Sequence, residues 1–99
     1  MRPKRISVRV KSESWKVVFK RPTEDDYIGV EEDDIGLCVE EDKKIFVDPD
    51  PSSVLSTSIH EVLHAVRPEL SEEAVLSTAT TIAKVLWKFN YRKQNNNDE

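Results

Sequence analysis

The sequence contains little glycine, little cysteine and no long apolar run. Two glycines in 99 residues exclude collagen-like, glycine-rich linker and P-loop sequences. A single cysteine, Cys38, excludes a disulfide framework and a cysteine-based zinc finger. No apolar run exceeds five residues, whereas a membrane-spanning helix needs roughly 20. The basic N-terminus is followed by no apolar segment of the kind that a secretory signal requires. We therefore expect a cytoplasmic protein with no membrane partner.

The charges that the sequence does have are unevenly distributed. Residues 1–21 contain eight basic and one acidic residue, a net charge of +7, whereas residues 22–50 contain two basic and twelve acidic residues, a net charge of −10. Because the whole chain carries −4, we expect the basic segment to neutralise the acidic one and not to bind nucleic acid. The length fits one small domain, expected over 1–93, and the polar residues 94–99 are expected to form a disordered tail.

Alternating apolar and polar residues predict four strands in the first half of the chain. The strands are expected over 6–10, 15–19, 35–39 and 44–48. The first two should form one hairpin, with its turn at 12–14, and the last two another. The acidic residues 21–34 read as a loop between the hairpins.

Helical periodicity predicts two helices in the second half of the chain. The first is expected to run to about Val66 from a cap at Ser52 or Ser53, and the second from Glu72 to about Tyr91 with Ser71 as its cap. Their expected apolar faces consist of Leu55, Ile59, Val62, Leu63 and Val66, and of Val75, Leu76, Ala79, Ile82, Ala83, Leu86 and Phe89. Strands first and helices last indicate an α+β fold, a small and mainly antiparallel sheet packed on two C-terminal helices.

The first predicted helix contains His60-Glu61-Val62-Leu63-His64, which matches the H-E-x-x-H pattern of zinc metallopeptidases. Residues four apart lie one turn apart on the same helix face, so both imidazoles can reach one metal ion. The intervening Glu61 is then placed to act as general base on a water molecule. The alternative interpretation is a pair of ordinary surface histidines, or a metal site without catalytic function.

A third ligand is required, and the sequence contains no third histidine. The only aspartate after His64 lies in the tail, so the candidates are Glu69, Glu72 and Glu73. Glu72 should project on the buried side of the second helix and is the expected ligand, with Glu73 as the alternative. Glu72 also has a simpler explanation, since a carboxylate in the first turn of a helix interacts favourably with the helix dipole.

Several other residues carry less specific expectations. Gly36 permits either a close backbone approach of a peptide or a bulge. Cys38 is expected in the core, and the two tryptophans as core or interface anchors. Tyr27 and Tyr91 are the only tyrosines that could stabilise an oxyanion, but packing or surface positions suit them better.

The chain resembles compact gluzincin-type metallopeptidases, including small phage-encoded minigluzincins, and the core of ImmA/IrrE-type peptidases. The resemblance covers roughly residues 35–90 and is carried by 35–38, 44–47, 58–65 and 70–75. It implies a zincin-like fold with Zn²⁺ bound by His60, His64 and Glu72, and with Glu61 as general base. It also implies a peptide or protein substrate, and a host-cytoplasmic location if the protein is phage-encoded.

We therefore expect a small zinc-dependent metallopeptidase. The alternative is a catalytically weak or inactive zincin-like module that binds a regulatory or host protein. The presence of Glu61 favours the enzyme, because a purely structural metal site needs no base at that position. We expect no separate substrate-selecting lobe in 99 residues, and therefore rank the metal site above general proteolysis.

Overall fold

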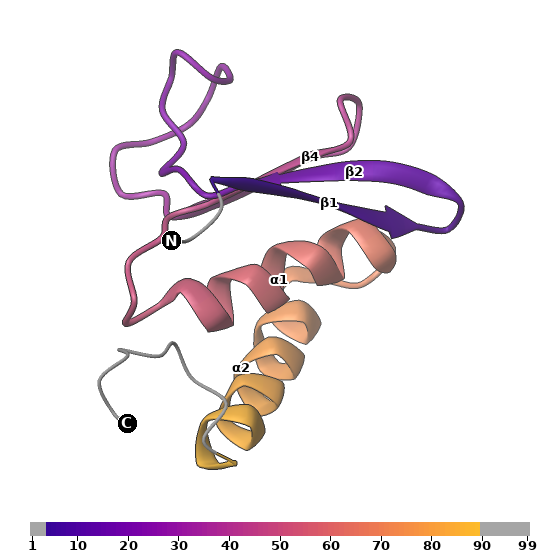
Figure 1. Cartoon of the computed structure of the whole chain (residues 1–99), viewed down its shortest axis with the longest axis vertical. Coiled ribbons are helices and arrows are strands. Elements are labelled where there is room, and N and C mark those ends of the chain that lie inside the picture. Colours follow the sequence, from indigo (N-terminus) through magenta and orange to yellow (C-terminus); the bar gives the residue numbers. More distant parts are fainter. Residues whose placement is uncertain (1–3, 90–99) are drawn as a thin grey trace.

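Four strands precede two helices in the computed structural model, which describes residues 4–89 (Figure 1). The elements are β1 (Arg5–Val10), β2 (Glu13–Val18), β3 (Gly36–Val39), β4 (Lys44–Val47), α1 (Val54–Val66) and α2 (Glu72–Lys88). The predicted α+β class is confirmed. Within the described part of the chain, neither helix is long and apolar enough to cross a membrane.

The sheet is mixed, with the strand order β1-β2-β4-β3. Both predicted hairpins form antiparallel pairs, and β2 and β4 join them as a parallel pair in which Val17 lies opposite Ile45. The long acidic loop between β2 and β3 allows the second hairpin to dock in this way. The strand β3 consequently lies at an edge of the sheet.

The turn between β1 and β2 lies earlier in the sequence than predicted. Val10 pairs with Glu13, so Glu13 and Ser14 belong to β2 and the turn consists of Lys11 and Ser12. Both turn residues have positive φ, at 52° and 76°. Two-residue hairpin turns of this kind match the twist of the strands that they connect, which explains why the expected turn over 12–14 is wrong.

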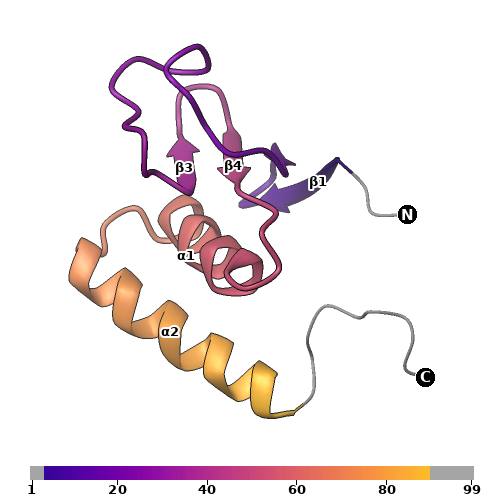
Figure 2. The same ribbon diagram turned by 90° about the vertical axis from the view of Figure 1, so that its left-hand side faces the viewer.

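Helix α1 lies between the sheet and α2, so that the molecule has three layers (Figure 2). The core between sheet and α1 consists of Val10, Trp15, Val17, Ile45, Val47 and Ala65. The most buried positions of α1 are Thr57, Glu61 and Ala65, one turn apart and not in the predicted apolar arc, whose members are only half-buried. With layers on two sides, α1 has no fully exposed face.

Helix α2 packs mainly against α1 among the described elements. Val75 and Ala79 are buried as predicted, whereas Leu76, Ile82 and Phe89 are exposed. The apolar face expected of α2 is therefore only partly covered. The helix ends at Lys88, and the predicted continuation to Tyr91 and the predicted tail 94–99 lie outside the described residues.

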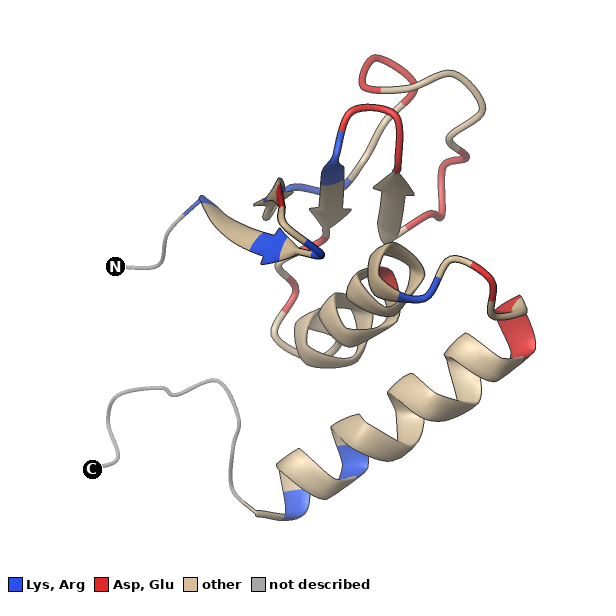
Figure 3. Ribbon diagram, turned by 90° about the vertical axis from the view of Figure 1, so that its right-hand side faces the viewer, with Lys and Arg blue, Asp and Glu red and all other residues tan. Residues whose placement is uncertain are grey.

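The acidic loop lies beside the sheet and carries much of the negative charge (Figure 3). Two ion pairs connect the basic segment to the acidic one, Lys20 with Asp26 at 2.6 Å and Arg21 with Asp48 at 3.3 Å. Both pairs lie at the end of the basic segment that leads into the loop, so the structure shows the expected neutralisation for Lys20 and Arg21.

Candidate metal centre

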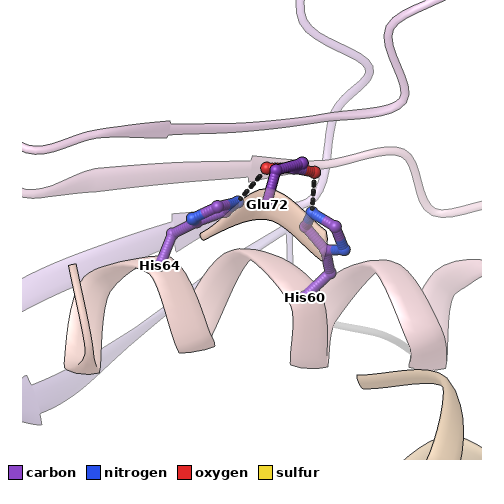
Figure 4. A group of neighbouring side chains, drawn as sticks. All are labelled: His60, His64 and Glu72. Carbon is purple, nitrogen blue, oxygen red and sulfur yellow. Dashed lines mark hydrogen bonds and ion pairs between the residues drawn. The ribbon is translucent and has the colours of Figure 1, made fainter. Parts of the chain in front are cut away.

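The two histidines of the sequence lie on the same face of α1 and point toward the start of α2 (Figure 4). They are one helical turn apart, and their ring centroids are separated by 5.0 Å. The helix runs unbroken through both positions, so the backbone places the two side chains on the same face, one turn apart. The Nε2 atoms of both rings are directed at one carboxylate, that of Glu72.

Glu72 is the first residue of α2, and its two carboxylate oxygens each approach one histidine. Oε2 lies 2.9 Å from Nε2 of His60, and Oε1 lies 3.0 Å from Nε2 of His64. The start of α2 is fixed by Ser71, whose side chain accepts a hydrogen bond from the backbone N–H of Ala74. The cap predicted from the sequence therefore positions the third group of the site.

The structure distinguishes the three glutamates that the sequence left as candidates. The group of described residues that could hold a metal ion consists of His60, His64 and Glu72. Glu69 instead pairs with Arg67 in the turn between the helices. Glu73, the predicted alternative, is exposed and does not belong to the group.

The three side chains fit a cation in donor type and in spacing. Their ligand atoms lie within 4.8 Å of one another. Tetrahedral zinc with bonds of about 2.0–2.1 Å requires donors about 3.3 Å apart, so small side-chain rotations bring them to bonding distance. The Glu72 side chain is 70% exposed, so the prediction that it projects on the buried side of α2 is wrong. This exposure leaves the side chain free to make such an adjustment. The site can therefore bind a metal ion.

Glu61 lies on the sheet-facing side of α1 and is 9% exposed. Burial, and secondarily the charges of Glu72 and Asp34, raise its pKa from an ordinary 4.5 to about 7. A carboxyl group with such a pKa can exchange a proton near neutral pH. Glu61 also lines the same cleft as the three candidate ligands.

Gly36 provides the space that Glu61 occupies. A Cβ atom at this position would lie 2.6 Å from Oε2 of Glu61 and 2.7 Å from Cγ2 of Thr57. Gly36 pairs regularly with Val47, so it does not form the bulge that was one of the two expectations. Gly36 does permit a close approach, but the described groups that approach it are the side chains of Glu61 and Thr57 in α1, not a peptide backbone. A glycine in a strand was the only sequence signal of this contact.

The cleft between β3 and the helices has a volume of about 470 Å³. It is lined by Asp34, Gly36, Leu37, Cys38, Glu40, His60, Glu61, His64, Pro68 and Glu72. Cys38, expected in the core, is only half-buried there, although it packs against core residues. Burial, followed by the charges of Glu61 and Glu40, raises the pKa of its thiol to about 12. Cys38 is therefore a protonated thiol and a poor metal ligand in this state.

The tyrosines do not contribute to the described cleft. The Tyr27 hydroxyl donates a hydrogen bond to Glu41, and Tyr27 does not line the cleft. Tyr91 lies outside the described residues. Sequence reasoning also missed Asp34, whose carboxylate influences Glu61 from the acidic loop, because no local pattern indicates which loop residue reaches the site.

Comparisons of the chain with protein-family models, with curated proteins and with solved structures found no match. The fold alone does not determine a function, because one architecture can support many kinds of site. The assignment of a function therefore depends on the side chains of the centre and on the groups around it.

Proposed function

We propose that this protein is a small zinc-dependent metallopeptidase that hydrolyses peptide bonds in the cleft between β3 and α1. The observation that carries the proposal is the position of Glu61, a buried carboxyl group that lines the same cleft as His60, His64 and Glu72. A site that only held a metal ion for stability would gain nothing from a buried acid at this place, because burying a carboxylate costs free energy.

Zinc is the metal that the donor set favours. Two imidazoles and one carboxylate form a ligand set found in catalytic zinc sites, and three protein ligands leave a fourth position open. When bound, zinc would polarise the peptide carbonyl and lower the pKa of a water molecule toward about 7. His60 and His64 would supply neutral nitrogen donors, and Glu72 would balance part of the charge.

The role of Glu61 in this proposal is proton transfer. From its place in the cleft, Glu61 would accept a proton from the attacking water and deliver the proton to the leaving amine. Gly36 serves the same step by leaving room for the Glu61 carboxylate between strand and helix. Because β3 is an edge strand beside the cleft, its free backbone groups can pair with an extended peptide.

The proposal is tested with the zinc-loaded protein and a mixture of unfolded protein substrates, with cleavage followed by mass spectrometry. We expect cleavage that a chelator abolishes and added zinc restores. Glu61→Gln should lower the rate at least about 100-fold while zinc remains bound, because it removes the base and keeps the shape. Glu73→Gln, on the same helix turn as Glu72, is the matched control and should retain full activity.

The result that contradicts the proposal is equally specific. Chelator-sensitive cleavage that survives Glu61→Gln would exclude Glu61 as the base. Stoichiometric zinc with no cleavage of any substrate would favour the alternative, a zincin-like module that binds a protein partner.

A further inference from the structure

A second cavity extends from the candidate metal centre along the junction of α1 and α2. Its lining includes His60, Glu61 and Glu72 at one end and Ser56 and Thr80 at the other. A third cavity begins at the same two residues, Ser56 and Thr80, and continues to the far end of α2. The two cavities together form one groove, which we call the interhelix groove, and it opens at the metal centre.

The far part of the interhelix groove has a distinct chemical character. It has a volume of about 370 Å³ and is lined by the apolar side chains of Leu55, Ala83 and Trp87. Trp87 is 47% exposed, although large aromatic side chains are usually covered in proteins of this size. The apolar surface of the groove is therefore accessible to a binding partner.

The charges at the far end are of one sign. Lys84 and Lys88 line the groove and are the only charged residues of α2 after its first turn (Figure 3). No described carboxylate forms a salt bridge with either of them. An apolar surface flanked by two cations that form no ion pair with any described residue is complementary to apolar side chains followed by acidic ones.

We propose that the interhelix groove is a substrate-recognition site for peptides that carry bulky apolar residues followed by acidic residues at a distance from the scissile bond. The proposal rests on the proposed peptidase function and assigns its substrate class. From Glu72 to Lys84 and Trp87 the axis of α2 rises about 18–22 Å, at 1.5 Å per residue. An extended peptide covers that distance with about six residues. The recognition residues therefore lie about six positions from the bond that is cut.

A peptide substrate is the occupant that the observations favour, because the groove is continuous with the cleft that holds the reactive groups. A groove that served a second copy of the chain or another segment of this chain would have no reason to open at the metal centre. Substrate selection is thus assigned to a surface between the two helices.

The test measures binding without requiring turnover. Fluorescein-labelled ten-residue peptides with a Leu-Leu-Asp-Glu block at either end are titrated with full-length Glu61→Gln protein, with and without zinc, and followed by anisotropy. Trp87→Ala should weaken binding at least about 10-fold. Phe89→Ala is the matched control, because Phe89 is 80% exposed but lies just after the end of α2 and does not line the groove. Its binding should change less than about twofold.

A charge exchange provides a second measurement with variants at exposed positions. The double variant Lys84→Glu and Lys88→Glu should lose affinity for the acidic peptide and gain it for a Leu-Leu-Lys-Lys peptide of the same length. We expect the difference in peptide affinity between Trp87→Ala and Phe89→Ala to persist without zinc, because α1 and α2 form the groove by themselves. A failure of the proposed catalysis would therefore leave this result intact.

Three outcomes overturn the proposal. Equal losses of peptide affinity in Trp87→Ala and Phe89→Ala would show that the groove is not the peptide-binding site. A dimer in sedimentation that Trp87→Ala converts to a monomer would assign the groove to a second copy. Displacement of the probe by a synthetic copy of residues 90–99 would assign it to the chain's own C-terminal segment.

Discussion

The buried Glu61 makes the metal-free protein less stable as the pH rises, and Glu61→Gln should remove this dependence. The folded protein holds the pKa of Glu61 at about 7, above the ordinary 4.5 expected after unfolding. Between these values the unfolded chain releases a proton that the folded chain keeps, so the free energy of unfolding falls with pH. The contribution of Glu61 to the free energy of unfolding is fully present below about pH 4.5 and is lost as the pH rises through 7.

The magnitude follows from the two pKa values. Each pKa unit corresponds to about 1.4 kcal/mol, so the loss for Glu61 is at most about 3 kcal/mol. This is a large part of the total stability of a small domain. Glutamine has the same shape and does not ionise, so the free energy of unfolding of the variant should equal or exceed that of the wild type at every pH. The difference between the two proteins should grow from near zero at pH 4.5 to about 2–3 kcal/mol at pH 8.

The assay is urea unfolding of the metal-free proteins at pH 4.5, 6 and 8, followed by circular dichroism. With an m value of about 1 kcal/mol/M, the urea midpoint of the variant should exceed that of the wild type by about 2 M at pH 8. Glu73→Gln is the control for loss of an exposed carboxylate and should show no such trend. A difference between wild type and Glu61→Gln that does not change with pH would refute the reasoning.

Three further predictions concern the surroundings of the centre. Gly36→Ala should lower stability by about 1–3 kcal/mol and reduce cleavage while zinc binding persists, because the new Cβ displaces Glu61; urea unfolding and zinc titration check this, and unchanged stability would contradict it. Ser71→Ala should lower the free energy of unfolding by about 1 kcal/mol and weaken zinc binding, because it removes the cap that positions Glu72. Ser71→Asn, which keeps a capping side chain, should retain both the stability and the zinc affinity. Cys38 should react with Ellman's reagent at pH 8 at least about 100-fold more slowly than free cysteine; reaction at the free rate would exclude the raised pKa.

The parts of the site that local spacing determines could be predicted from the sequence. His60 and His64 lie one turn apart on a helix that ends at Val66, just before Arg67 and Pro68, whereas the predicted serine cap at its start makes no side-chain hydrogen bond at Ser53. Glu72 follows Ser71, whose capping side chain fixes where α2 begins. In each case the interaction connects residues a few positions apart, and the backbone period alone places the side chains.

The parts that depend on long-range packing could not be predicted. The contact between Gly36 and Glu61 requires β3 to lie over α1, and no pattern in either segment encodes that pairing. The exposure of Ile82 and Phe89 arises because α2 packs mainly against α1 among the described elements. Helical periodicity identifies an apolar face, but whether a second layer covers the face is decided by the tertiary fold.

The most direct test of the central claim is the zinc affinity of matched variants, measured by calorimetry with metal content determined on the same samples. We predict one zinc ion per chain, a loss of at least about 10-fold in affinity for Glu72→Gln, and no change for Glu73→Gln. Absence of stoichiometric zinc from the wild type, or equal affinities for the two glutamine variants, would contradict the assignment of His60, His64 and Glu72 as the metal centre.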